Sequence, residues 1–308
     1  MNKELIHTGI STKLKYDIPD GACDCHHHIY DPNRFPYLFG GSRPQPAATA
    51  ADYAVLKDHL HLTRNVIVQP FGYWTDNRCT LDALSYFGKE QARAIAVIDE
   101  KITDEELSAM NKAGVRGIRF NIMDRMPFDP SSIGHLAERI APMNWSIHFW
   151  MNPDRIVEWK DILKNLPCQI VFDHLGHIPH DKAVGANTGH PAVGIICDLM
   201  QREKAWVKLS GIYLDTACSD YSDTIELGRL YVSVDPGRCL WGTDWPHPTS
   251  FNRNEPMPDD AAMLNALMEM AGSKEIFDRI LVDNPTELFG PWGRSFCHEE
   301  CPSGLIRT

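Results

Sequence analysis

The chain has 308 residues, of which 43% are hydrophobic and 23% are charged, a composition with enough apolar material for a large folded core. Its formal net charge of -11, with no compensating cluster of lysine and arginine, argues against general binding to nucleic acid or to anionic membranes. No apolar run approaches the roughly 20 residues of a membrane-spanning helix, and we see no secretory segment, so we expect a cytoplasmic protein whose cysteines are reduced.

Eight short apolar or β-branched segments along the chain are typical of buried strands. They are Ala22–Ile29, Asn65–Gln69, Ala94–Asp99, Gly117–Asn121, Trp145–Met151, Gln169–His174, Ala205–Ser210 and Cys239–Asp244. Amphipathic stretches typical of helices lie between them, at Tyr53–Leu62, Thr103–Ala113, Asp154–Leu166 and Ile225–Val234. Eight strand–helix units predict a single α/β domain, a (β/α)8 barrel over residues 21–292, with an N-terminal extension over 1–20 and a C-terminal tail over 293–308.

One helix has clear boundaries in the sequence. Thr103 and Glu106 have the spacing of a capping box, in which each side chain binds the backbone N–H of the other residue. Gly114 follows the last residue of the same stretch, where a glycine commonly ends a helix. We therefore expect a helix over Thr103–Ala113.

In a barrel of this kind the active site lies at the carboxyl ends of the strands. Most of the predicted strands end on polar side chains, namely His26 and His28, Gln69, Asp99, Arg119 and Asn121, Asp173 and His174, Ser210, and Asp244. Polar residues gathered at strand ends predict a site at the mouth of the barrel.

Within this set, three imidazoles and a carboxylate are expected to converge. Alternation along the first strand predicts that Asp24, His26 and His28 share one face. Cys25 and His27 are expected to point to the other face. His174 and Asp244 come from strands around the same mouth, so the histidines and Asp244 are predicted to form a functional cluster.

The sequence leaves two chemistries open for this cluster. With a divalent cation, neutral imidazoles and a carboxylate complete a zinc-like site whose bound water is acidic near neutral pH. Without a cation, the histidines polarise a carbonyl group while Asp244 takes a proton from water. Our hypothesis is one zinc ion bound by His26, His28 and His174, with Asp244 on the ion or on its water.

Two further segments offer candidates for substrate binding. Arg119 and Arg125 lie in GVRGIRFNIMDRM, and guanidinium groups bind carboxylate or sulfonate in two-point geometry. Asn77, in the segment VQPFGYWTDNR, is expected either to line a small-molecule site or to cap the following helix. Cys297 and Cys301 in the C-terminal tail do not close a tetrahedral metal site, because two thiolates alone are too few.

Seven motifs carry a resemblance to a known family: DCHHHIYD, VQPFGYWTDNR, GVRGIRFN, VFDHLGHIP, VKLSG, WGTDWPHP and VDNPTELFG, in this order along the chain. The chain resembles the lactonase branch of the amidohydrolase superfamily, in particular the 2-pyrone-4,6-dicarboxylate lactonases and the 4-sulfomuconolactone hydrolases. The resemblance implies a distorted (β/α)8 barrel. It also implies a hydrolase that opens a small anionic, unsaturated lactone in the breakdown of aromatic compounds.

The resemblance implies roles for individual residues. The histidines that polarise the lactone carbonyl in these families match His26, His28 and His174, and the aspartate that activates water matches Asp244. Contacts to the substrate carry over to Arg119, Arg125 and Tyr37, and to Trp150, which stands where the family tends to have tyrosine. The 4-sulfomuconolactone hydrolases imply one zinc ion, whereas the dicarboxylate lactonases imply none.

The chain departs from the family pattern in two places. No lysine ends strand four or five, and strand five ends on Trp150 rather than histidine, so a binuclear metal site is not expected. Where the dicarboxylate lactonases have an arginine after VKLSG, this chain reads Ile212-Tyr213-Leu214, so Tyr213 is the candidate contact and a muconolactone-type substrate is favoured. The alternatives are a metal-dependent decarboxylase of an unsaturated acid on the same barrel and, as a third class, a non-catalytic binding protein.

Overall fold

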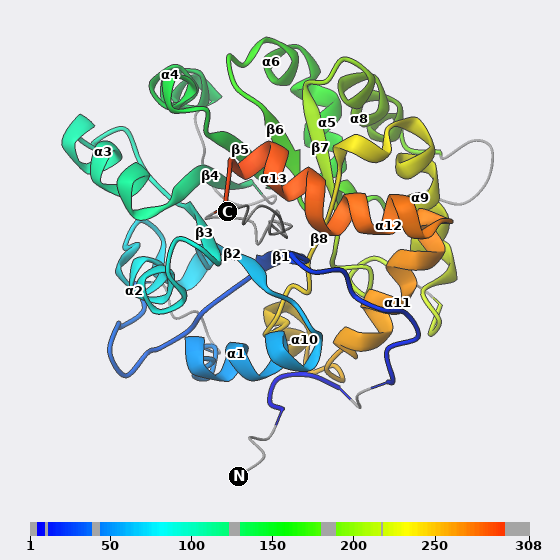
Figure 1. The fold of residues 1–308 in the computed structure, drawn as a ribbon. Helices are drawn as coiled ribbons and strands as arrows, with labels where there is room; N and C mark the ends of the chain where they lie inside the picture. The colour runs from blue at the N-terminus through cyan, green and yellow to red at the C-terminus, as the bar shows by residue number, and fades with distance from the viewer. Residues whose placement is uncertain are drawn as a thin grey trace, which may run out of the picture.

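The computed structural model describes residues 5–9, 12–38, 44–122, 130–179, 189–216 and 218–292. Within them, eight parallel strands form one sheet whose spatial order follows the chain, and this sheet curls into a barrel surrounded by helices (Figure 1). The strands are β1 (Cys23–His27), β2 (Arg64–Val68), β3 (Ala92–Ala96), β4 (Val115–Ile122), β5 (Ser146–Met151), β6 (Ile170–Phe172), β7 (Ala205–Leu209) and β8 (Cys239–Trp241). The predicted single-domain barrel is confirmed.

Helices surround the barrel, and α13 lies across the end that faces the viewer in Figure 1. They are α1 (Ala50–His59), α2 (Arg78–Phe87), α3 (Asp104–Ala113), α4 (Pro130–Ile140), α5 (Pro153–Glu158), α6 (Lys160–Asn165), α8 (Pro191–Gln201), α9 (Ser222–Val234), α10 (Pro248–Arg253), α11 (Asp260–Ala271), α12 (Lys274–Asp278) and α13 (Asn284–Phe289). The predicted capping box at Thr103 is formed, and Gly114 ends α3 in the left-handed conformation. The predicted helix Asp154–Leu166 is two helices, because the backbone leaves helical geometry at Trp159 (φ -97°, ψ 13°).

Strands β6 and β8 end earlier than predicted. The sequence predicts that they reach His174 and Asp244, but both residues have positive φ, 50° and 63°. Extended strands need negative φ, so the chain must turn before it reaches these residues. The turns place both side chains in the loops directly after the strands, where the catalytic groups of a barrel lie.

The beginning and the end of the barrel meet where the chain after β8 runs beside β1. Asp244 donates its backbone N–H to the carbonyl of His26 (2.8 Å), and His28 donates to the carbonyl of Trp245 (2.7 Å). At the opposite end, Phe289 of α13 belongs to the cluster of buried side chains inside the barrel. Figure 1 looks at the barrel from this closed end, with α13 lying across it.

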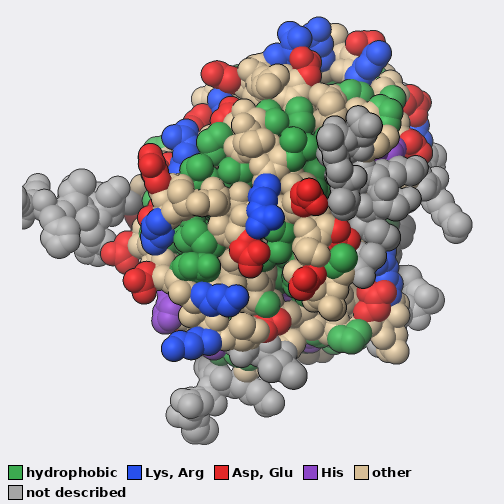
Figure 2. Space-filling model, turned by 90° about the vertical axis from the view of Figure 1, so that its right-hand side faces the viewer, with side chains coloured by type: hydrophobic (Ala, Val, Ile, Leu, Met, Phe, Trp, Pro, Cys, Tyr) green, Lys and Arg blue, Asp and Glu red, His purple; other side chains and the backbone are tan. Residues whose placement is uncertain are grey.

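The segment before the barrel packs along its side. Gly9 donates its N–H to the carbonyl of Pro258 (2.7 Å), and Lys15 donates its N–H to the side chain of Asn265 (2.8 Å). The face shown in Figure 2 carries acidic and basic side chains interspersed with hydrophobic ones. Among the described helices, none combines the length and the apolar character that crossing a membrane requires.

The capping box of α3 offers a direct test of this fold. Thr103 accepts the N–H of Glu106 (3.1 Å), and the Glu106 carboxylate accepts the N–H of Thr103 (2.8 Å). We expect Thr103→Ala to lower the free energy of unfolding by about 1 kcal/mol in urea denaturation, the typical loss for this cap position. Ser108→Ala, an exposed change on the same helix, should not destabilise the protein. Equal midpoints for the two variants would contradict the expected contribution of the cap.

Candidate active site

Strand β1 breaks the strict alternation that the sequence analysis assumed. Its pairing with β2 shifts register between Asp24 and His27. Asp24 faces α1, where it accepts a hydrogen bond from Tyr53 (2.9 Å), and the ring of His27 stacks on Tyr53 at 3.6 Å. The prediction that Asp24 shares a face with His26 and His28 is wrong, because an irregularity in a strand changes which side chains point inward.

Asp24 instead joins β1 to the chain after β8. Its Oδ1 accepts the backbone N–H groups of His26 (2.9 Å) and Thr243 (3.1 Å), and its Oδ2 accepts the Thr243 hydroxyl (2.7 Å). Burial raises the pKa of Asp24 to about 6, although these hydrogen bonds oppose the rise. Cys25, expected beside His27, belongs to the buried cluster inside the barrel.

Three histidines and one aspartate meet at the mouth of the barrel. The Nε2 atoms of His28, His26 and His174 lie 3.4, 3.6 and 3.7 Å from Oδ1 of Asp244. All four residues are buried, with at most 4% of their surface exposed. One carboxylate oxygen therefore faces three imidazole nitrogens, which is the convergence that the strand ends predicted.

The far nitrogens of two of these rings are held by neighbours. His28 donates its Nδ1–H to the carbonyl of Val68 (2.8 Å), since a carbonyl can only accept. Nδ1 of His174 lies 3.0 Å from the hydroxyl of Ser210. These contacts fix the ring planes and turn the Nε2 atoms toward Asp244.

A buried charge network, to which the sequence analysis assigned no role, lies beside His26. Oδ1 of Asp173 is 3.1 Å from Nζ of Lys208 and 3.3 Å from Nδ1 of His26, and Oδ2 accepts a hydrogen bond from Nε of Arg119 (2.9 Å). Burial alone would raise the pKa of Asp173, but Lys208, His26 and Arg119 hold it well below its usual range. The motif VKLSG contains the sequence evidence for this network, because Lys208 lies inside a buried strand and a buried lysine needs a charged partner.

Strand β5 also carries a buried histidine, His148, that was not among the predicted site residues. His148 is fully buried, with Nδ1 4.0 Å from Oδ1 of Asp173 and Nε2 3.0 Å from the hydroxyl of Ser146. Burial lowers the pKa of His148 well below its usual value, so this ring is neutral near pH 7.

Burial and the neighbouring rings set the charges of the cluster. Burial opposes ionisation of Asp244, but His174, His28 and His26 hold the pKa of its carboxyl well below the usual range. Burial lowers the pKa of His174 to about 4 and that of His26 well below its usual value. At neutral pH the site therefore holds the carboxylate of Asp244 facing the neutral rings of His26 and His174.

The loop after β7 shapes both sides of the cluster. Tyr213, a predicted substrate contact, donates its hydroxyl to Oδ2 of Asp244 (2.7 Å) and leaves Oδ1 to the histidines. Gly211 has a φ of 59°, and a Cβ at this position would lie 2.5 Å from Nδ1 of His174. Glycine is therefore the residue that allows the ring of His174 to lie against this loop.

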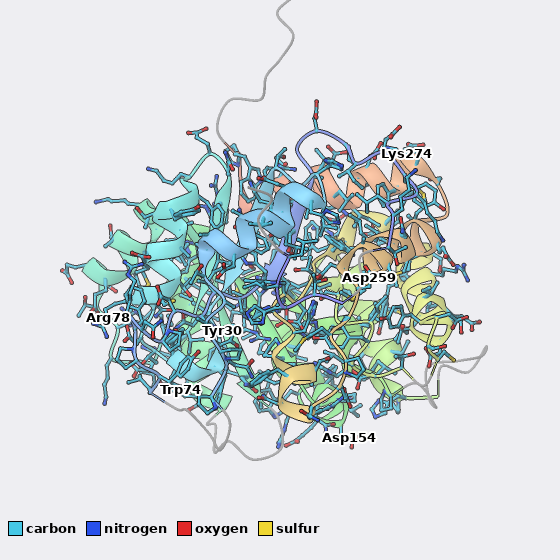
Figure 3. All side chains as sticks on the ribbon, turned by 90° about the horizontal axis from the view of Figure 1, so that it is seen from below. Tyr30, Trp74, Arg78, Asp154, Asp259 and Lys274 are labelled. Carbon is cyan, nitrogen blue, oxygen red and sulfur yellow. The ribbon has the colours of Figure 1, made fainter. Side chains whose placement is uncertain are left out.

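A hollow of about 440 Å³, including its open mouth, shares Arg119 with the charge network. Its lining consists of Gln69, Phe71, Trp74, Val97, Ile98, Arg119, Phe120 and Asn121. Figure 3 shows Trp74 and Asp154 of α5 at the same end of the molecule, with Lys274 of α12 at the opposite end. Apolar walls with one guanidinium suit a small molecule that carries an acidic group.

The other predicted substrate residues have different surroundings. The guanidinium of Arg119 lies 5.3 Å from the ring centre of Trp150, so Trp150 borders the site. Tyr37 donates its hydroxyl to the carbonyl of Gln45 (2.9 Å). Arg125 lies outside the described residues, as does the tail that contains Cys297 and Cys301.

Asn77 is occupied by backbone groups. Its amide donates to the carbonyls of Thr75 (3.0 Å) and Val97 (2.8 Å), and its carbonyl oxygen accepts the N–H of Val97 (3.0 Å). The side chain is 5% exposed and makes no capping bond to α2. The structure thus gives Asn77 the role of a brace between two loops, in place of the predicted substrate contact or cap.

The donor atoms of the cluster fit one divalent metal ion. His26, His174 and Asp244 offer ligand atoms that lie within 4.8 Å of one another. In a tetrahedral zinc site with bonds of roughly 2.0–2.1 Å, ligand atoms are about 3.4 Å apart, and here the two nitrogens lie 3.6 and 3.7 Å from the carboxylate oxygen. Nε2 of His26 is buried without a hydrogen-bond partner, as suits a ligand atom. His28 is not in this set.

Comparison with known proteins places the site in a family. The model of the amidohydrolase family matches residues 23–290. A 2-pyrone-4,6-dicarboxylate hydrolase from Comamonas testosteroni is 32% identical over 292 residues, covering 91% of this chain and 93% of that protein. A 4-sulfomuconolactone hydrolase from Hydrogenophaga intermedia is 30% identical and covers 90% of this chain and 91% of its own. An apo structure from Agrobacterium tumefaciens matches with a TM-score of 0.77 and 28% identity, over 88% of this chain and 96% of that one.

Acid should destabilise the fold through His27, which lies behind the cluster. Burial lowers the pKa of His27 from 6.5 to about 3. Below pH 6.5 the unfolded chain therefore binds a proton that the folded protein does not. Stability should fall as the pH drops from about 6.5 toward 3, by about 1.4 kcal/mol per pH unit for this group.

A comparison of variants separates the effect of His27 from that of Asp24. Because the pKa of Asp24 is raised in the folded protein, Asp24 makes the fold less stable as the pH rises, which is the opposite direction. His27→Phe keeps a ring against Tyr53 and should make the pH dependence of urea unfolding shallower by about one proton between pH 6.5 and 4.5. His135→Gln, an exposed change on α4, should leave the slope unaltered. Identical slopes for wild type and His27→Phe would show that His27 is protonated in the folded state.

Proposed function

This chain belongs to the amidohydrolase family, and on that premise we propose that it is a lactonase acting on a small anionic lactone. The observation that carries the proposal is that one oxygen of Asp244 faces three imidazole nitrogens at 3.4–3.7 Å in a buried site. A base and polarising groups that meet at one point suit attack of water on a carbonyl group. The relatives named as lactone hydrolases support a ring ester as the group attacked.

In the proposed reaction, the carbonyl oxygen of the lactone lies among His26, His28 and His174. Asp244 takes a proton from a water molecule, whose oxygen forms a bond to the carbonyl carbon. The ring carbon–oxygen bond then breaks, and the departing oxygen receives the proton that Asp244 holds. Water is thus added across the ring ester, which yields a new carboxylic acid and a hydroxyl group, or a ketone when the departing group is an enol.

The charges near the cluster support a particular class of lactone. Arg119 lines the hollow, and its Nε is fixed by Asp173, so the guanidinium is held in one orientation for an acidic substituent. Tyr213, which stands where the dicarboxylate lactonases have an arginine, brings no positive charge and is engaged with Asp244. We therefore place the substrate among the muconolactone-type, unsaturated lactones of aromatic breakdown, with Arg125 as a further candidate contact.

A metal ion is compatible with this scheme. Zinc held by His26, His174 and Asp244 would supply a Lewis acid for the carbonyl oxygen and would acidify a water molecule. The surrounding residues keep their roles in either case. Tyr213 holds Oδ2 of Asp244, and the hydroxyl of Ser210 holds Nδ1 of His174.

Replacing Asp244 with asparagine removes the proposed base while keeping the size of the side chain. We expect Asp244→Asn to lower turnover of the preferred lactone by roughly 10²–10⁴-fold, the usual contribution of general base catalysis. Asp99→Asn, an exposed aspartate that follows β3, should leave turnover unaltered. The assay is hydrolysis of a panel of anionic lactones, followed as acid release.

The same assay distinguishes the decarboxylase that the sequence left as an alternative. Release of carbon dioxide without ring opening would replace the lactonase proposal. Hydrolysis of every active lactone at equal rates by wild type and Asp244→Asn would remove Asp244 from the role of base.

The metal hypothesis has its own test. We expect protein purified without chelator to contain about one zinc ion per chain by elemental analysis, and His174→Gln to reduce that content. The exposed substitution His61→Gln should not change it. Chelation should lower turnover and added zinc should restore it. Full turnover by metal-free protein would show instead that the histidines polarise the carbonyl themselves.

A further inference from the structure

Outside the cluster of His26, His28, His174 and Asp244, two buried nitrogen atoms near His174 have no hydrogen-bond partner. They are Nε1 of Trp150, at the end of β5, and Nε2 of His177, in the turn after β6. The two ring centres are 5.9 Å apart, and the ring of His177 lies 5.3 Å from that of His174. Neighbouring strands thus bring two unpaired polar atoms to the edge of the catalytic cluster.

These two nitrogens differ in their hydrogen-bonding capacity. The indole Nε1–H of Trp150 can only donate a hydrogen bond. Nδ1 of His177 lies 2.9 Å from Oδ2 of Asp215, and a carboxylate only accepts, so the hydrogen of the ring is on Nδ1. With that hydrogen on Nδ1, Nε2 is an acceptor when the ring carries a single proton. The corner between β5 and β6 therefore holds a donor and an acceptor on two rings whose centres are 5.9 Å apart.

A hydroxyl group is the substituent that matches such a pair, because it accepts one hydrogen bond and donates another. We infer that Trp150 and His177 bind a hydroxyl group carried by the substrate close to the carbonyl that His174 contacts. The inference rests on the proposed lactonase function and narrows its substrate to a hydroxylated lactone. The side chain of Trp150 is partly exposed, although its Nε1 is buried, and Asp215 holds His177 in position before the ligand binds.

An unpaired indole nitrogen alone would not support this assignment. Trp292 also has a buried Nε1 without a partner, but its ring packs against the guanidinium groups of Arg64 and Arg93 beside the buried cluster that α13 closes. Trp150 differs because its neighbour is His177, which Asp215 holds in place, and because the ring of His174 lies beside that of His177. Trp292 therefore provides a matched control for the loss of an indole N–H.

The experiment compares two five-membered lactone carboxylates that differ only in one ring hydroxyl. Their affinities are measured by calorimetry in the Asp244→Asn background, where turnover is slow, and their kcat/KM values are measured with the otherwise wild-type enzyme. We expect the hydroxylated lactone to be preferred by about tenfold in both measurements, the effect of a hydrogen-bonded pair that the deoxy compound leaves unmade.

Trp150→Phe and His177→Phe remove the nitrogens and keep a ring at each position. Each should abolish most of the tenfold preference while changing the affinity for the deoxy lactone little, and Trp292→Phe should retain the full preference. An absence of preference in the wild-type background, or an equal loss of both lactones in Trp150→Phe, overturns the inference. Preferential binding without hydrolysis by the wild-type enzyme would instead reject the lactonase proposal and leave the hydroxyl site standing.

Discussion

The geometry of the site depends on the buried carboxylate of Asp173. It lies between Lys208 and Arg119 in the interior of the barrel, where a carboxylate without partners would be strongly destabilising. Asp173 and Lys208 also reach Nδ1 of His26, at 3.3 and 2.9 Å, so the groups that neutralise the buried charge set the orientation of a ring in the cluster. Arg119 belongs to β4 and Lys208 to β7, and Asp173 directly follows β6. Losing any of them would leave a charge unpaired, which ties the chemistry at the mouth to the stability of the barrel.

Closure of the barrel imposes a second constraint, which the irregularity in β1 satisfies. Asp24 lies on the outer side of β1, so its oxygens can accept hydrogen bonds from Thr243 and from Tyr53 of α1. A regular strand would have aimed Asp24 into the site beside His26. The register shift therefore separates a carboxylate that joins the strands from the carboxylate of Asp244, which faces the histidines. Two carboxylates close together would have disfavoured each other's ionisation.

The sequence predicts what local chemistry determines. The order of the strands, the capping box of α3 and the convergence of strand-end histidines with Asp244 follow from periodicity, capping rules and the topology of a barrel. The sequence could not predict that His26 points into the site while Asp24 points away from it, because this depends on how β1 pairs with β2. Asn77 illustrates a related limit. A polar residue in a promising segment binds the backbone of a loop 20 residues further on, a contact that only the folded chain creates.

The low pKa of Asp244 bears on its proposed role as a base. A carboxylate with a pKa far below neutral is a weak base, and Asp244 owes its low pKa to the three rings around its Oδ1. In the lactonase reaction that we propose, a carbonyl oxygen that enters among these rings would compete with Asp244 for the same nitrogens. The carboxylate then loses stabilisation and becomes more basic at the moment when a bound carbonyl needs a nucleophile. Tyr213 continues to hold Oδ2, so Asp244 keeps its orientation while Oδ1 is released toward water. In the proposed lactonase reaction, binding of the substrate would thus make Asp244 a stronger base.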